Sequence, residues 1–180
     1  VEHLLKQAVP DVGKPQGCRK HAGLHLALRT HPDVARYWTF GFVRNPWARY
    51  VSWWSMVQKV SAPESRSKWS RKSGFVQGAA KYPSFEAFVD RGPEDFGRLS
   101  RPQISYLSTT TRRADFIGRT ETFAEDMRAV LARLDLPVPE ELPQRNRSTH
   151  GSYRDYYTPA TRDRIGELFK DDVDAFLYDF

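Results

Sequence analysis

Two short apolar runs along the chain predict buried β-strands. Residues 37–43 read Tyr-Trp-Thr-Phe-Gly-Phe-Val, a run of β-favouring residues typical of a strand buried on both faces. Residues 115–118, Asp-Phe-Ile-Gly, form a second and shorter run of this kind. Helical spacing follows each run, and strands that alternate with helices are typical of an α/β fold with a parallel sheet flanked by helices.

Helices are predicted where apolar residues return every three or four positions. The first begins at Pro46, with Asn45 as its N-cap, because the missing N–H of proline would be unpaired at that position anyway. Others follow Ser84, Thr122 and Thr158, and Thr122 has the spacing of a capping box with the glutamate three residues later. The expected buried residues are Trp47, Tyr50, Val51, Trp54 and Val57 in the first helix, Phe85, Phe88 and Val89 in the second, Phe123, Met127, Val130, Leu131 and Leu134 in the third, and Ile165, Leu168, Phe169, Val173, Phe176 and Leu177 in the last.

Residues 61–81 are rich in Ser, Lys, Arg and Gly and are predicted to form a basic, flexible loop. Four basic side chains surround Trp69 there: Arg66, Lys68, Arg71 and Lys72. They either hold an acidic sugar or a single-stranded nucleic acid, or are simply solvated. The chain shows no repeat, and 180 residues match one ordinary domain, so we expect a single domain over residues 1–180.

Charge and composition narrow the class of partner. The 28 Lys and Arg residues exceed the 22 Asp and Glu residues, and the net charge of +6 favours an anionic partner. A single cysteine excludes an internal disulfide, and no cluster of His, Cys and Asp has metal-ligand spacing, so we expect no bound metal. No run approaches the roughly 20 apolar residues of a membrane span, and no signal peptide is visible. We therefore expect the chain in the cytoplasm, and its excess of arginine over lysine is compatible with a bacterial source.

The turn after the first predicted strand carries the groups of an anion-binding site. Arg44 ends the strand, and the helix that begins at Pro46 offers backbone N–H groups and the positive end of its dipole. Ser52, on the second turn of that helix, adds a hydroxyl. The open alternative is that Arg44 pairs with a carboxylate and that Ser52 is a small packing residue. The Gly-x4-Gly-Lys-Ser/Thr pattern of a Walker A loop is absent from the sequence.

Residues 40–52, Phe-Gly-Phe-Val-Arg-Asn-Pro-Trp-Ala-Arg-Tyr-Val-Ser, resemble the 3′-phosphate-binding segment of sulfotransferases that use 3′-phosphoadenosine 5′-phosphosulfate (PAPS). Arg-Pro-Gln-Ile-Ser-Tyr-Leu at residues 101–107 and Asp-Phe-Ile-Gly-Arg-Thr-Glu at 115–121 resemble the carbohydrate and family-2 branch of that family. The resemblance implies a P-loop-NTPase-like sulfotransferase fold. It also implies PAPS as donor, adenosine 3′,5′-bisphosphate (PAP) as product and a hydroxyl of a carbohydrate or similar molecule as acceptor. No nucleic-acid partner is expected.

The resemblance assigns four residues to the nucleotide. Arg44 and Ser52 match the two residues that hold the 3′-phosphate in the family. Arg147 and Ser148 fall in a polar segment that, by resemblance, closes over the nucleotide, with Arg147 as a second phosphate contact. The open alternative for Arg147 is a solvated side chain.

Two further residues are candidates for the acceptor side of the reaction. His21 lies in a Lys-His-Ala segment that is similar to a Lys-His stretch of the same branch, and a histidine can take the proton of an attacking hydroxyl. Glu121 follows the second predicted strand and is a candidate contact of the acceptor hydroxyl. The alternatives are a surface or helix-capping role for His21 and a cap or an ion pair with Arg119 for Glu121.

One family feature has no match in the sequence. Sulfotransferases of this kind open with a strand and a Pro-Lys-x-Gly-Thr/Ser-type loop around the 5′-phosphosulfate, and nothing before Arg44 matches it. Either the sequence starts downstream of this N-terminal strand and loop, as Val1 in place of Met allows, or the protein has lost them. Loss predicts a rival function, a non-catalytic module that binds PAP or an anionic polymer. A Golgi-lumen location is expected only if an upstream membrane anchor is missing.

Overall fold

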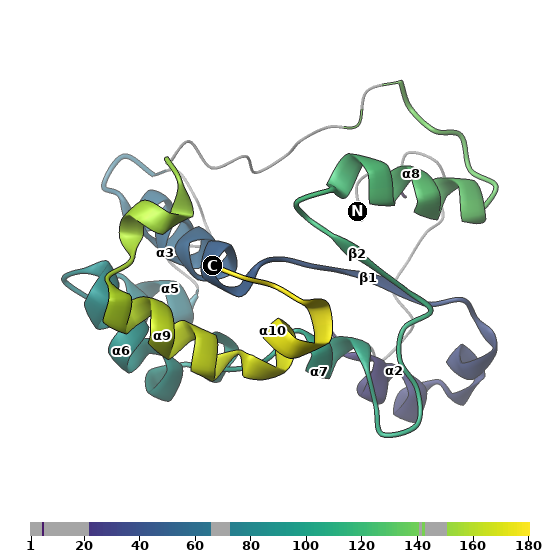
Figure 1. Ribbon diagram of the computed structural model, residues 1–180, viewed down its shortest axis with the longest axis horizontal. Helices are drawn as coiled ribbons and strands as arrows, with labels where there is room; N and C mark the ends of the chain where they lie inside the picture. The colour runs from purple at the N-terminus through teal and green to yellow at the C-terminus, as the bar shows by residue number, and fades with distance from the viewer. Residues whose placement is uncertain (1–4, 6–21, 66–72, 141, 143–150) are drawn as a thin grey trace. The chain divides into compact units, whose positions relative to one another are not determined.

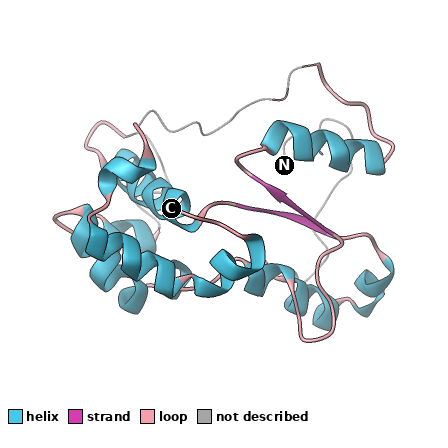
Figure 2. Ribbon diagram, viewed as in Figure 1, coloured by secondary structure: helices cyan, strands magenta, loops and turns pink. Residues whose placement is uncertain are grey.

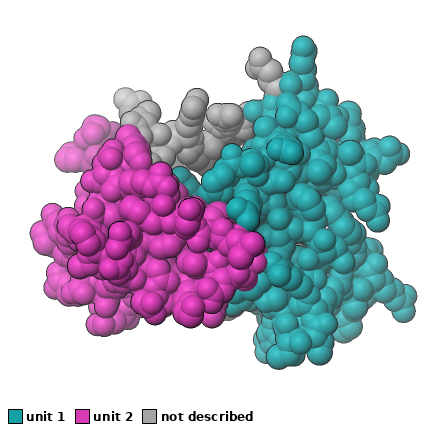
Figure 3. Space-filling view, in the orientation of Figure 1, with its two compact units in different colours: residues 1–44, 103–145 teal, residues 45–102, 146–180 magenta. Residues whose placement is uncertain are grey.

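A computed structural model of the protein describes residues 5, 22–65, 73–140, 142 and 151–180 (Figure 1). The described residues belong to two compact units, which Figure 3 colours separately. Unit 1 comprises residues 1–44 and 103–145, and unit 2 comprises residues 45–102 and 146–180. Parallel strands accompanied by helices confirm the expected α/β class (Figure 2). The expectation of a single domain stays a prediction.

Unit 1 is built on two parallel strands, β1 (Phe40–Val43) and β2 (Phe116–Arg119), paired in register from Phe40 with Phe116 to Val43 with Arg119. Both strands occur where the apolar runs predict them. The expectation that the first is buried on both faces is wrong, because only Val43 of β1 is fully buried and the other three residues are half-buried.

Helix α8 (Phe123–Arg133) covers one face of these strands (Figure 1). Its buried residues are the predicted Met127, Val130 and Leu131, which pack with Leu142 against the aromatic side chains of Trp38, Phe40, Phe42, Phe116 and Phe123. Leu134, predicted to be buried with them, is 38% exposed because it lies past the last helical residue. Local periodicity therefore identifies the helix and its buried stripe, but not where the stripe ends.

The capping box expected at Thr122 does not form. Thr122 is the N-cap residue of α8, but its hydroxyl donates a 2.7 Å hydrogen bond to Asp126 instead of accepting one from a backbone N–H. The same Asp126 carboxylate accepts the backbone N–H of Arg119 at 2.7 Å. Asp126 therefore joins the end of β2 to the first turn of α8, and the negative charge is favourable at a helix N-terminus.

The opposite side of β1 contacts a short helix, α7 (Ile104–Leu107). A Cβ placed on Gly41 would overlap a methyl carbon of Leu107, so a larger residue there would require the Leu107 side chain to move. Helix α7 also packs against α2 (Leu24–Thr30), where a Cβ on Gly23 would lie 3.1 Å from the Cα of Tyr106. Both contacts fix the position of α7 beside the end of β1.

A carboxylate joins the residues that precede the two strands. Asp115 accepts hydrogen bonds from the N–H of Thr39 at 2.7 Å, from the Thr39 hydroxyl at 2.8 Å and from the Arg112 guanidinium at 3.2 Å. These bonds, led by that of the Thr39 backbone, lower the pKa of Asp115 to about 2. Since the folded pKa lies below the ordinary value of 3.8, the stability that Asp115 contributes is present above that value and is lost as the pH falls towards 2.

Replacing Thr39 with valine is expected to raise the pKa of Asp115, because one of the donors that stabilise the ionised carboxylate is removed while the β-branched shape is kept. An NMR titration of the Asp115 carboxyl group measures the change. Thr30→Val, at the end of α2, is the matched control and should leave that pKa unchanged. An unchanged value in Thr39→Val would show that the hydroxyl does not contribute.

Unit 2 is helical. Helix α3 (Pro46–Ser61) packs against α6 (Phe85–Asp95) and α9 (Pro159–Leu168), and α10 (Lys170–Phe176) follows α9. Tyr50, Phe88 and Phe169 form the aromatic centre, with ring centroids of Tyr50 5.2 Å from Phe88 and 6.0 Å from Phe169. The short 3-10 helices of the two units are η1 (Pro32–Arg36), η2 (Gly97–Leu99) and η3 (Tyr153–Tyr156).

Two predictions for unit 2 are wrong. Within the expected loop 61–81, the structure contains helix α5 (Gly74–Ala79), capped by Ser73 and anchored by Phe75, whose ring lies 5.2 Å from that of Phe96. The four basic residues around Trp69 lie outside the described residues. Leu177, expected to be buried, is 85% exposed because it ends α10 with a left-handed backbone (φ 52°) that turns its side chain away from the helix face.

Candidate functional site

Arg44 lies at the carboxyl end of β1, where its backbone is held by the side chain of Gln103. The Arg44 N–H donates to Gln103 Oε1 at 3.0 Å, and Gln103 Nε2 donates to the Arg44 carbonyl at 2.8 Å. Gln103 is buried, with 9% of its surface exposed. One amide therefore satisfies both backbone polar groups of Arg44 just beyond the last residue of the strand.

The guanidinium of Arg44 is half-buried. Burial lowers its pKa, and the negative charge of Glu121 acts in the opposite direction. Within the described part of the chain, the Arg44 side chain has neither an ion-pair nor a hydrogen-bonding partner. A cation that has lost part of its hydration without gaining a hydrogen bond or a close ion pair is suited to bind an anionic ligand.

The start of α3 differs from the sequence expectation. Asn45 is the N-cap, as predicted, and its Oδ1 accepts the N–H groups of Trp47 at 3.0 Å and Ala48 at 3.2 Å. Pro46 has no N–H, and the N–H of Arg49 bonds to the Asn45 carbonyl at 2.8 Å. The first-turn donors expected to be available to an anion are therefore already used, and the expectation of free N–H groups there is wrong. An anion near this turn would depend on side chains.

Ser52 lies on the second turn of α3 and is half-buried. It belongs to unit 2, whereas Arg44 is the last residue of the first segment of unit 1. Their joint action on one phosphate stays a prediction from the sequence segment that contains both.

Arg49, one turn before Ser52, has a role that the sequence does not reveal. Its guanidinium donates to the Arg101 carbonyl at 3.2 Å and lies 4.0 Å from the fully buried carboxylate of Asp172. The same group stacks over the ring of Trp53, 4.2 Å from the centroid. These contacts, together with a 2.8 Å bond from Asn45 Nδ2 to the Asp179 carbonyl, join α3 to the C-terminal segment. Arg49 is thus engaged within the protein.

Of the acceptor-side candidates, the structure describes only Glu121. It is exposed and follows β2, so it lies near the same edge of the sheet as Arg44, and its charge acts on the Arg44 guanidinium. His21, Arg147 and Ser148 lie outside the described residues.

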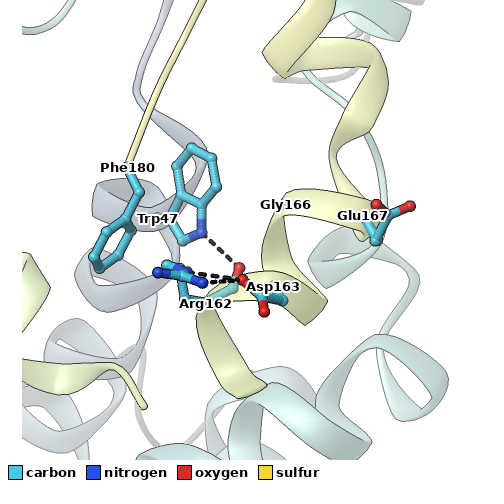
Figure 4. Close-up of a pocket in the computed structure, with 6 residues that line it drawn as sticks. All are labelled: Trp47, Arg162, Asp163, Gly166, Glu167 and Phe180. Atoms are coloured by element: carbon cyan, nitrogen blue, oxygen red, sulfur yellow. Dashed lines mark hydrogen bonds and ion pairs between the residues drawn. The ribbon is translucent and has the colours of Figure 1, made fainter. Parts of the chain in front are cut away.

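A small hollow of about 240 Å³ lies in unit 2 (Figure 4). Its lining residues are Trp47, Arg162, Asp163, Gly166, Glu167 and Phe180. Their polar groups bond to one another: Trp47 Nε1 donates to the Arg162 carbonyl at 2.8 Å, and Arg162 pairs with Asp163 at 2.7 Å. Neither Arg44 nor Ser52, the two described residues that are predicted to bind the nucleotide, lines this hollow.

The described residues contain neither a candidate metal site nor a candidate membrane-spanning helix. In the portion of the chain that is described, no three His, Cys, Asp or Glu side chains gather in a way that could bind a metal ion. Across the same residues, no helix is both long and apolar enough to span a membrane.

The sequence as a whole is similar to one known family. A model of the sulfotransferase family matches residues 18–179, which include both strands and the Arg44 turn. No curated protein and no solved structure matches the sequence. The match covers most of the chain and agrees with the resemblance of residues 40–52, 101–107 and 115–121. The chain therefore belongs to the sulfotransferase family.

Proposed function

We propose that the protein binds PAPS and transfers its sulfuryl group to a hydroxyl of a carbohydrate or similar acceptor, releasing PAP. The observation that carries this proposal is Arg44, a half-buried cation at the end of a parallel strand with no ion-pair or hydrogen-bonding partner for its side chain among the described residues. Ligands of open α/β sheets bind beyond the carboxyl ends of the strands, where Arg44 lies. Family membership supports the type of reaction.

In the proposed reaction the acceptor oxygen forms a bond to sulfur. The bond between sulfur and the bridging oxygen breaks, its electron pair stays with the 5′-phosphate of PAP, and the hydroxyl proton passes to a base. The protein needs no covalent intermediate for this transfer, because holding donor and acceptor in line and stabilising the developing charge supply most of the acceleration.

Each candidate residue has a role in this proposal. Arg44 and Ser52 bind the 3′-phosphate, which PAPS has and adenosine 5′-phosphosulfate lacks. Arg147 and Ser148 contact the nucleotide from their polar segment, Glu121 orients the acceptor hydroxyl, and His21 accepts its proton. Of these residues the structure describes Arg44, Ser52 and Glu121, and the charges of Arg44 and Glu121 interact beside the ends of β1 and β2.

The acceptor class and the location are proposals of the same kind. A carbohydrate is favoured by the segments at 101–107 and 115–121, which resemble the carbohydrate branch. A cytoplasmic location is also a proposal, and it rests on the sequence features given under the sequence analysis and not on these segments.

A transfer assay tests the proposal. The protein is incubated with radiolabelled PAPS and a panel of mono- and oligosaccharides, and sulfated product and PAP are quantified together. We expect both to appear in equal amounts, and no transfer from adenosine 5′-phosphosulfate, which lacks the group that Arg44 binds. Tight PAP binding without transfer to any hydroxyl would favour the non-catalytic module instead. Equal transfer from both donors would contradict the assignment of Arg44.

A further inference from the structure

The Gln103 side chain makes a two-point contact with a single residue. Backbone pairing between the strands ends with the bond from the Thr120 N–H to the Val43 carbonyl at 2.8 Å, so Arg44 lies just past the ladder. Its N–H and carbonyl still need partners, because an unpaired polar group in a protein interior is costly. Gln103 supplies both, at 3.0 Å and 2.8 Å, from a position 59 residues away in the sequence.

Two bonds to the two sides of one residue restrict both of its backbone dihedral angles. The direction in which a side chain leaves the backbone follows from those angles, so the Gln103 amide restricts where the Arg44 guanidinium can lie. Both of these hydrogen bonds go to backbone atoms of Arg44, so neither of them uses its guanidinium. This combination suits a binding residue that must be held in place and still be available to a ligand.

Gln103 is itself anchored to the same strand. It precedes α7, and its carbonyl accepts the N–H of Tyr106 at 2.9 Å. The side chain of Leu107, the last residue of α7, packs so closely on β1 that it would have to move to admit a Cβ atom on Gly41. The segment Pro-Gln-Ile-Ser-Tyr-Leu thus contacts β1 at Gly41 and again at Arg44.

We propose that Gln103 is a positioning residue for the anion-binding side chain of Arg44. This rests on the proposed function, in which Arg44 binds the 3′-phosphate of PAP. Losing the Gln103 amide then affects ligands that carry a 3′-phosphate and spares those that do not. A residue that only stabilises the fold would affect both ligands alike.

The test is a double-mutant cycle with PAP and AMP as probes. Gln103→Leu keeps much of the side-chain volume and removes both hydrogen bonds, and we expect it to weaken PAP binding by about fivefold to twentyfold with AMP binding within about twofold of the parent. In an Arg44→Ala background the same change should cause almost no further loss, because the guanidinium that it positions is gone. Gln103→Met, which keeps the unbranched side chain, is the second variant with the same expectation if Gln103→Leu does not fold.

Leu131→Ala is the control for stability alone, since Leu131 is buried in α8 of the same unit and belongs to the cluster that covers the other face of the strands. It should leave the ratio of PAP to AMP affinity unchanged. Equal losses for PAP and AMP in Gln103→Leu, full additivity with Arg44→Ala, or the same change of ratio in Leu131→Ala would each overturn the inference. If Arg44→Ala itself leaves PAP binding intact, the proposed function fails; if only the Gln103 variants do so, the positioning role alone fails.

Discussion

Arg44→Ala is expected to weaken PAP binding by roughly tenfold to a hundredfold, about 1.5–3 kcal/mol, with AMP binding nearly unchanged. The guanidinium is half-buried and has no ion-pair or hydrogen-bonding partner within the described residues. Its removal should therefore change the stability of the protein little and mainly lower the affinity for the ligand. AMP lacks the 3′-phosphate, so its affinity should stay the same. Ser52→Ala should act in the same direction and more weakly. Isothermal titration with both nucleotides at one salt concentration measures these effects.

Two further variants separate charge from geometry. Arg128→Ala removes an exposed arginine from α8 and should leave both affinities close to those of the parent. Arg44→Lys keeps the charge but loses the planar fork of donors, so PAP binding should fall between the parent and Arg44→Ala. If Arg44→Ala weakened PAP and AMP equally, Arg44 would have to read another part of the nucleotide or support the fold.

Phe88→Ala is expected to lower the free energy of unfolding by about 3–5 kcal/mol. Phe88 is fully buried in α6, and its ring lies 5.2 Å from that of Tyr50, 5.4 Å from Trp54 and 5.8 Å from Tyr82. Truncation leaves a cavity at the point where α3 and α6 meet, and the surrounding aromatic rings cannot close it without leaving their own contacts.

Chemical denaturation followed by tryptophan fluorescence measures that loss. Glu86→Ala, an exposed position in the first turn of the same helix, is the control and should change stability by less than about 0.5 kcal/mol. A loss below about 1 kcal/mol for Phe88→Ala would show that the aromatic centre of unit 2 is less tightly packed than the structure indicates.

Local sequence patterns predict both strands, the start of α3 at Pro46 and the buried stripe of α8. These patterns fail where a side chain forms a different hydrogen bond from the one that its spacing predicts. The capping box at Thr122 is absent because Asp126 accepts both the Thr122 hydroxyl and the N–H of Arg119 at the end of β2. The spacing of these residues does not show that Asp126 is the acceptor for both groups.

In the candidate site, too, the sequence predicts some features and not others. Residues 40–52 predict Arg44 and the Asn45 cap, but the cap also occupies the N–H groups that were expected to meet an anion. In the sequence, Gln103 stands out only as part of a family-like segment. Its contact with Arg44 joins positions 59 residues apart, and local spacing does not predict such a contact. The sequence assigns no partner to Arg49, and its buried partner Asp172 becomes visible only in the packed unit.

We propose that this sulfotransferase-family chain recognises the 3′-phosphate of its nucleotide through Arg44. The most direct test titrates the unmodified protein with PAP and with AMP under identical buffer and salt. We expect PAP to bind at least about tenfold more tightly than AMP, because charge-assisted bonds to one additional phosphate are available only to PAP. Equal affinity for the two nucleotides would contradict it, and a steep fall in affinity for acidic polymers with salt would then favour the polymer-binding alternative.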